Sequence, residues 1–276
     1  MQLEQDDQFR RGIEFRDLHA GPGTFVIPNP WDAGSARILS GLGFRALATT
    51  SAGLAYSLGL PDGSNQLGRA QALDNARVIV AATSLPVSAD LESGYADDPA
   101  GIAETIRLAA EAGLAGGSIE DATGRPDAPI RPLSEAVERV SAAIEAAHAL
   151  PFPFTLTARA ENFLYGVRDL DDTITRLQAF EAAGADVLYA PFLPSLDAIA
   201  TVCSAVTLPV NVVATAAFTV ADLASRGVRR ISLGSGLARS ALGTLIRDAQ
   251  QINELGTFSF LADALPYPEA NKVMSS

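Results

Sequence analysis

The sequence predicts an α/β fold, a single (β/α)₈ barrel of the TIM type, from three observations. Eight short apolar runs recur along the 276 residues, nearly all of them are followed by a helical pattern, and 48% of the residues are hydrophobic. Parallel strands that are covered on both faces are apolar throughout, as these runs are. Such a barrel commonly spans about 250 residues as one domain. A doubly wound open sheet is the alternative.

The predicted elements alternate along the whole chain. The strands are expected over residues 24–29, 44–50, 85–92, 115–120, 154–160, 186–191, 209–214 and 229–234. The clearest helices are rich in alanine and span residues 98–112, 134–148 and 169–183. Gly113 and Gly184 follow two of these helices and favour their termination. Ser134 is the expected N-cap of the helix that starts there.

One domain is expected to cover residues 1–276, because no linker or change of composition divides the chain. Residues 1–20 form an N-terminal segment before the first strand. Residues 255–276 follow the eighth helix and contain Phe258, Phe260 and Leu261, which are too apolar for a free tail. We expect this C-terminal segment to pack on the barrel or on a neighbouring subunit.

Composition excludes several classes of function. The formal net charge of −12 and the pI of about 4.6 argue against nucleic acid or an anionic membrane as the main partner. Cys203 is the sole cysteine, which excludes an internal disulfide and a cysteine-based zinc site. The first residues carry no secretory pattern, and no apolar run reaches the roughly 18 residues of a spanning helix. A cytoplasmic protein is therefore expected.

Carboxylates end two neighbouring predicted strands. Asp90 and Glu92 close the third strand and are expected on one face, because side chains alternate along a strand. Two like charges on one face need a cation between them, and Mg²⁺ or Mn²⁺ prefers such oxygen ligands. Glu120 ends the next strand and would complete the metal site. Asp121 points the other way and is expected to cap a helix or form an ion pair.

Other polar residues are expected near these carboxylates. Arg159 ends the fifth strand, and a buried guanidinium needs a carboxylate partner from the protein or a substrate. Ser51 lies in a run of small residues whose backbone N–H groups could approach an anion. Asp62 lies in a turn that could reach the site. Asn211 lies inside an apolar strand and needs hydrogen-bond partners, so a structural role and a substrate contact both remain open.

The two histidines, His19 and His148, are expected at the surface. They therefore provide neither a histidine metal cluster nor a Ser-His-Asp arrangement. The turn of residues 234–236 after the eighth strand could hold a phosphate or simply start the last helix.

Together these motifs resemble the isocitrate lyase / phosphoenolpyruvate mutase superfamily. The resemblance covers about residues 20–255, and its pieces, in the family's order, are Thr50–Gly53, Leu58–Asp62, Asp90–Tyr95, Ile119–Asp121 and Ala158–Glu161. It implies a (β/α)₈ barrel with Mg²⁺ at the strand ends. It further implies that Asp90 binds the metal directly and that Asp62, Glu92 and Glu120 hold its waters.

The resemblance also implies the partners of this chain. Ser51, with the backbone of Ala52 and Gly53, would bind a substrate carboxylate, and Arg159 would contact the other end of a 2-oxoacid or its enolate. Members commonly exchange terminal helices between subunits and form dimers of dimers. A homo-oligomer, either a dimer or a tetramer with swapped helices, is therefore expected, and it would cover the apolar C-terminal segment.

The loop of residues 122–132 departs from the family pattern. The lyases carry a Lys/Arg-Cys-Gly-His loop here, with the cysteine as general acid, and the mutase branch carries a Lys-Thr-Asn-type loop. This chain has neither. The shared core implies an Mg²⁺-dependent carbon–carbon lyase that cleaves or decarboxylates a 2-oxo carboxylic or dicarboxylic acid, such as oxaloacetate, through an enolate-like intermediate. The general acid or base is not identified.

Two other functions remain alternatives: C–P chemistry on phosphonopyruvate, and a barrel that binds a 2-oxoacid with little turnover. The loop itself contains Gly124, Arg125, Arg131 and several prolines. This composition suggests a mobile, positively charged lid, with a plain surface loop as the alternative.

Overall fold

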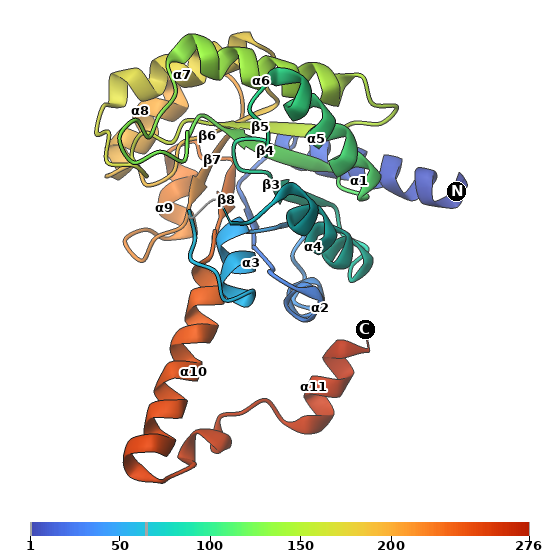
Figure 1. The fold of residues 1–276 in the computed structure, drawn as a ribbon, viewed down its shortest axis with the longest axis vertical. Helices are drawn as coiled ribbons and strands as arrows, with labels where there is room; N and C mark the ends of the chain where they lie inside the picture. Colours follow the sequence, from blue (N-terminus) through green and yellow to red (C-terminus); the bar gives the residue numbers. More distant parts are fainter. Residues whose placement is uncertain (1, 64–65, 276) are drawn as a thin grey trace.

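The computed structural model describes residues 2–63 and 66–275, which form eight parallel strands in a nearly closed barrel (Figure 1). The hydrogen-bonded order is β1-β8-β7-β6-β5-β4-β3-β2. The ring closes where the Ala48 N–H donates to the Pro28 carbonyl at 3.0 Å. The strands are β1 (Phe25–Ile27), β2 (Leu47–Ala48), β3 (Val87–Asp90), β4 (Gly116–Glu120), β5 (Thr155–Arg159), β6 (Val187–Tyr189), β7 (Val210–Val213) and β8 (Arg230–Ser232). The predicted barrel is confirmed, and the open doubly wound sheet is not formed.

Helices surround the barrel, plug one end of it and form an extension at the C-terminus (Figure 1). They are α1 (Gln2–Ala20), α2 (Ala33–Gly41), α3 (Ser51–Ser57), α4 (Arg69–Ala81), α5 (Pro99–Glu111), α6 (Leu133–His148), α7 (Leu170–Ala182), α8 (Leu196–Ala205), α9 (Val220–Ser225), α10 (Gly236–Leu255), the 3₁₀ helix η1 (Ser259–Ala262) and α11 (Tyr267–Met274). Gly113 and Gly184 adopt φ values of 86° and 100° after α5 and α7, as predicted. The predicted N-cap Ser134 is wrong: α6 begins after Pro132, whose restricted φ suits a helix start.

The core lies between the strands and the helical ring, and a second, smaller cluster closes one end of the barrel. In that cluster Phe15 of α1 is fully buried and packs with Phe25, Ile27, Ala46 and Ala115. Phe25, Ala46 and Ala115 lie at or just before the amino ends of β1, β2 and β4. Helix α1 therefore plugs that end, and the carboxyl ends of the strands remain for a site.

The prediction that His19 lies at the surface is wrong. It is 7% exposed, packs edge-on against Phe15 and Phe25, and its Nδ1 lies 2.8 Å from the Phe15 carbonyl. Its Nε2 lies 3.1 Å from Nη1 of Arg230, inside the barrel. The physical reason is the plug itself, because α1 presents this residue to the barrel floor. The His148 side chain is 55% exposed, as predicted.

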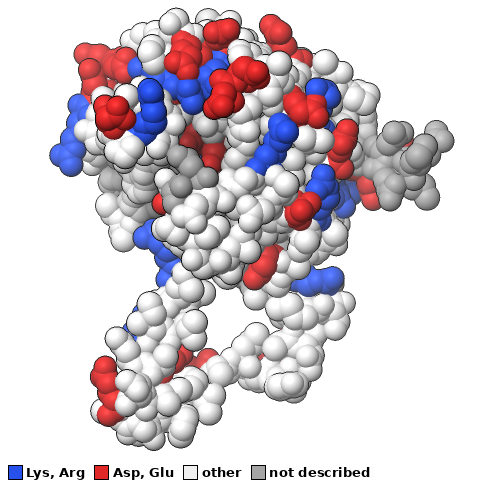
Figure 2. Space-filling model, viewed as in Figure 1, with Lys and Arg blue, Asp and Glu red and all other residues white. Residues whose placement is uncertain are grey.

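The C-terminal segment leaves the barrel along α10 and returns along α11, which packs against α2 (Figure 1). Figure 2 shows that this extension is mostly uncharged, whereas acids and bases mix over α6 and α7. Leu245, Ile246, Phe258 and Leu261 are exposed there, so the barrel of the same chain does not cover them. Of the predicted segment 255–276, Ser276 lies outside the described residues. None of the described helices has the length and hydropathy needed to cross a membrane.

The buried position of His19 predicts an acid-sensitive fold. Burial, followed by the charge of Arg230, lowers the pKa of His19 from 6.5 to about 3. A lowered pKa means that stability present above about pH 6.5 is lost as the pH falls toward 3, by up to about 1.4 kcal/mol per pH unit. We expect His19→Gln to flatten this fall in the free energy of unfolding, measured by urea denaturation between about pH 7 and pH 4. The matched control is His148→Gln, which removes the imidazole of the exposed histidine, and we expect its slope to stay closer to that of the wild type than the slope of His19→Gln. Equal slopes for wild type and His19→Gln would show that His19 is not the source of the acid sensitivity.

Candidate active site

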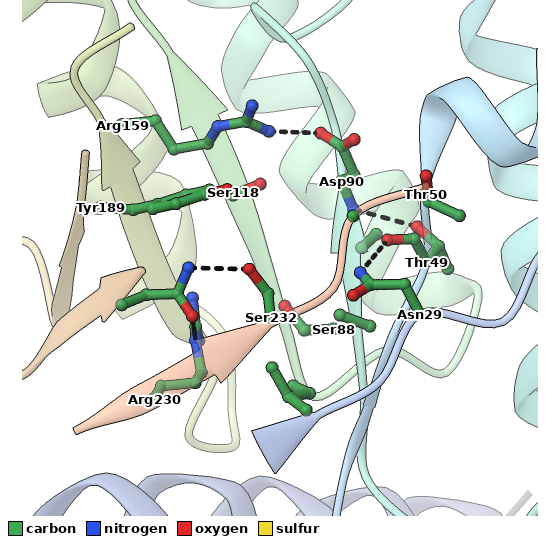
Figure 3. Close-up of a pocket in the computed structure, with 15 residues that line it drawn as sticks. Asn29, Thr49, Thr50, Ser88, Asp90, Ser118, Arg159, Tyr189, Arg230 and Ser232 are labelled. Atoms are coloured by element: carbon green, nitrogen blue, oxygen red, sulfur yellow. Dashed lines mark hydrogen bonds and ion pairs between the residues drawn. The ribbon is translucent and has the colours of Figure 1, made fainter. Parts of the chain in front are cut away.

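Arg159 lies at the centre of the strand-end surface and forms three ion pairs. It contacts Asp90 at 2.7 Å, Glu120 at 3.1 Å and Glu161 at 2.8 Å. Figure 3 shows its guanidinium reaching across to Asp90. The strand register places Glu120 of β4 directly beside Arg159 of β5. The sequence prediction that carboxylates and this arginine meet at the strand ends is thus confirmed for Asp90 and Glu120.

Asp90 also holds the start of α3. Its Oδ2 accepts hydrogen bonds from the Ser51 N–H at 3.2 Å and the Ser51 hydroxyl at 2.8 Å. The Gly53 N–H donates to the Thr50 hydroxyl oxygen at 3.2 Å, which caps the helix, and Ala52 lies between these two donors. The predicted substrate donors of Ser51 and Gly53 therefore contact protein groups here. A substrate would have to replace Asp90 at Ser51.

Glu92 reaches the site by a different route from the predicted one. Strand β3 ends at Asp90, and Glu92 has a φ of 48°, so the two carboxylates do not alternate along one strand. Glu92 nevertheless lines a pocket of about 300 Å³ together with Ser51, Asp62, Glu120 and Arg159. We call this the upper pocket. Burial, then the charges of Asp90 and Asp62, raises the pKa of Glu92 to about 7.

Carboxylates in the upper pocket outnumber the cations that neutralise them. Burial raises the pKa of Glu120 well above its usual range in spite of Arg159. Burial, then the charge of Asp90, raises the pKa of Asp62. The Tyr95 hydroxyl is buried with no hydrogen-bond partner among the described residues, and the charges of Glu92, Asp90 and Glu120 act on it. Protein partners do not use the full negative charge and hydrogen-bonding capacity of these groups. A cation and its water could therefore bind among them.

The donor set suits Mg²⁺ that keeps part of its water. All of the donors are hard oxygens, which Mg²⁺ prefers, and it commonly binds proteins through one or two carboxylates. Among residues 2–63 and 66–275, no three or more His, Cys, Asp or Glu side chains converge enough to hold a metal ion by themselves. The residues therefore fit a partly hydrated ion rather than a closed protein cage.

The loop of residues 122–132 is anchored from behind the site. Asp121 points away from the upper pocket, as predicted: it accepts from the Glu161 N–H at 2.9 Å and pairs with Arg176 at 3.1 Å. Arg176 also donates to the Arg131 carbonyl at 2.8 Å. Arg125 lines the upper pocket. The Arg131 guanidinium instead pairs with Glu135 of α6.

A second cavity of about 80 Å³ lies deeper in the barrel, below Asp90 and Arg159 (Figure 3). We call it the chamber. Asn211 lines it, donates to the Ser232 hydroxyl at 3.1 Å, and accepts from Nε of Arg230 at 2.9 Å. Tyr189 also lines it, with its ring centroid 5.1 Å from the Arg159 guanidinium carbon.

Sequence reasoning missed Tyr189 and Arg230. Arg230 could have been found from the sequence. It lies two residues before Ser232 in the predicted strand 229–234, so both side chains are expected on the same face of that strand. Gly234 lines the edge of the chamber, and the side chain of Ser235 does not cap α10. The predicted phosphate role of this turn stays a prediction.

Comparisons with known proteins identify the family of this chain. A family model described as phosphoenolpyruvate phosphomutase matches residues 15–253. A crystal structure from Burkholderia cenocepacia J2315, of a protein named only by class as a lyase or mutase, is 55% identical over 98% of both chains, with a TM-score of 0.95. The 2-methylisocitrate lyase of Shewanella oneidensis is 30% identical over 93% of this chain and 92% of that one. The oxaloacetate decarboxylase of Bradyrhizobium diazoefficiens is 31% identical over 72% of this chain and 69% of its own. The chain therefore belongs to the phosphoenolpyruvate phosphomutase family, within the isocitrate lyase / PEP mutase superfamily of lyases and mutases.

Proposed function

We propose that this chain is an Mg²⁺-dependent lyase that acts on a 2-oxo carboxylic or dicarboxylic acid and cleaves or decarboxylates it through an enolate-like intermediate. The observation that carries the proposal is the excess of carboxylates around Arg159 at the carboxyl ends of β3, β4 and β5. Relatives named as 2-methylisocitrate lyase and oxaloacetate decarboxylase support the same class of reaction.

Three carboxylates would hold the metal. Asp90 would bind it directly, and Glu92 and Glu120 would hold it through its water molecules, with Asp62 as a further acceptor for those waters. A phosphonopyruvate hydrolase of the same fold, 23% identical to this chain, was solved with oxalate and Mg²⁺, which guides the choice of probe below. When bound, Mg²⁺ supplies positive charge that stabilises the negative charge developing on the 2-oxo oxygen.

The protein's own groups orient the acid. Arg159 presents two Nη groups, now paired with Asp90 and Glu120, which would donate to a carboxylate or enolate oxygen of the substrate. Ser51 would donate its hydroxyl and N–H to the same acid once the substrate replaces Asp90 there. Arg125 on the lid lines the upper pocket, where closure would exclude water. Loss of CO₂ from a β-carboxy-2-oxoacid needs no base, which suits a loop without the family's Cys or His.

Asp90→Asn tests the site. We expect it to abolish the Mg²⁺-dependent binding of oxalate in a calorimetric titration, because one direct metal ligand is lost. We expect pyruvate release from oxaloacetate to fall by at least about 100-fold, the usual size for losing one group that stabilises the transition state. Asp74→Asn is the matched control, since Asp74 lies on the exposed surface beside Arg77.

The outcomes separate the alternatives. Retained turnover in Asp90→Asn would refute the site. Oxalate binding without any product from oxaloacetate would favour a 2-oxoacid-binding barrel. Release of inorganic phosphate from phosphonopyruvate would instead favour C–P chemistry.

We also propose that the chain forms a homo-oligomer through its C-terminal segment. Helix α10 exposes Leu245 and Ile246, and the segment after it exposes Phe258 and Leu261. Exposed apolar side chains gathered on one extension are typical of an interaction surface. A second copy of this chain, arranged as a dimer or tetramer with exchanged helices, would cover them.

Truncation after Asn253 tests the oligomer. It removes the apolar side chains of η1 and of the residues on either side of it. On the proposed oligomer, these side chains cover the apolar face of α10 in a neighbouring copy. We therefore expect either a smaller mass in light scattering or precipitation. A soluble truncated chain with the full-length oligomeric mass would contradict the proposal. Leu42→Ser, which removes a single apolar side chain that is exposed outside the extension, is the control and should keep the full-length mass.

A further inference from the structure

Arg230 is a buried cation that no acid neutralises. It is 5% exposed, inside the barrel. Its Nε donates to Asn211 at 2.9 Å and its Nη2 donates to Thr157 at 3.0 Å, while its Nη1 lies 3.1 Å from His19. All three partners are neutral groups. Within the described part of the chain, no carboxylate forms an ion pair with it.

His19 cannot supply the missing negative charge. Its Nδ1 faces the Phe15 carbonyl, which only accepts, so Nδ1 carries the hydrogen. Its Nε2 is then a lone pair that accepts from Arg230. The ring is held neutral as an acceptor on the floor of the barrel. The His19 ring therefore orients the Arg230 guanidinium but does not neutralise its positive charge.

The chamber does not neutralise Arg230 from its own lining. Its charged lining residues are Asp90, Arg159 and Arg230, and Asp90 is already paired with Arg159. An isolated buried charge is destabilising unless a partner of opposite charge is present. Burial lowers the pKa of Arg230 to about 10, so the guanidinium stays protonated at neutral pH. Three of its five N–H groups have acceptors, which leaves two for a ligand.

A carboxylate complements this uncompensated charge. The planar guanidinium matches a carboxylate with parallel N–H donors, and the Ser232 hydroxyl lines the chamber beside it (Figure 3). The volume of about 80 Å³ holds a carboxylate and a neighbouring carbon, at roughly 10–15 Å³ for each water-sized group. Arg159 lines both the chamber and the upper pocket, so an acid held at Arg159 can reach down.

We propose that Arg230, Asn211 and Ser232 form a second carboxylate-binding subsite at the floor of the chamber, which selects dicarboxylic over monocarboxylic substrates. This subsite rests on the proposed function, because the other end of the same acid is placed at Arg159 and Ser51. It extends that function by assigning the second carboxylate to the barrel interior rather than to the lid.

Malate and lactate test the subsite, because both carry a 2-hydroxy acid end and only malate has a second carboxylate. We expect the wild-type chain with Mg²⁺ to bind malate more tightly than lactate in calorimetric titrations. We expect Arg230→Gln to weaken malate binding by about 10- to 100-fold, the range for a lost hydrogen bond to a charged group. Binding of lactate and of oxalate, which occupy the upper end only, should change by less than about twofold.

Controls keep the result clear. Arg229→Gln removes the neighbouring arginine, which bonds to Gly23 outside the chamber, and should leave the malate preference intact. If Arg230→Gln does not fold, Ser232→Ala removes a hydroxyl of the subsite and should lower the same preference.

The outcomes distinguish this subsite from the proposed function. No malate preference in the wild type, or a preference that survives in a folded Arg230→Gln variant, would overturn the subsite. Equal losses of malate, lactate and oxalate would also overturn it and leave Arg230 as a structural group. Absence of Mg²⁺-dependent oxalate binding in the wild type would count against the proposed function alone, because the malate–lactate ratio still judges the subsite.

Discussion

The ion pairs of Arg159 are the constraint on which the strand-end surface depends. Its three acids come from β3, from β4 and from the chain after β5. At an effective dielectric constant of about 20, two like charges about 4 Å apart repel by about 4 kcal/mol. Without the guanidinium, Asp90, Glu120 and Glu161 could not share this buried space. The order β3-β4-β5 and the register that pairs Glu120 with Arg159 are thus requirements of the charge arrangement as well as of the barrel.

A second set of contacts connects the two ends of the barrel. Phe15 and His19 bring α1 to the barrel floor, His19 accepts from Arg230, and Arg230 orients the Asn211 amide in the chamber. Each step is a hydrogen bond of about 3 Å between buried groups, where a lost partner is costly. The plug formed by α1 is therefore part of the support of the chamber, although it lies at the end of the barrel opposite to the upper pocket.

The sequence predicted those features that depend on local pattern. Parallel strands are apolar throughout, so all eight strands could be located, and Asp90, Glu120 and Arg159 could be placed because they end such strands. The errors concern long-range partners and local turns of the chain. His19 and Arg230 are 211 positions apart, and nothing near either residue indicates that they meet. Glu92 was assigned to the face of a strand, but the chain leaves the strand at Asp90 and turns with a positive φ. Ser51 was expected to contact a substrate carboxylate, which stays a prediction; in this structure its hydroxyl donates to Asp90.

The candidate site is electrostatically polarised, because acids dominate the upper pocket and an unpaired arginine lies in the chamber. The upper pocket has more carboxylates than cations, with raised pKa values at Asp62, Glu92 and Glu120, and so favours a cation. The chamber has an arginine without an acid and so favours an anion. The Arg159–Asp90 pair lies between them. A 2-oxoacid has the matching polarity, because its oxo and carboxylate oxygens chelate a metal and a second carboxylate can lie at the other end. On the proposed function, the protein would therefore align such a substrate along the barrel axis by electrostatics, before any lid closes.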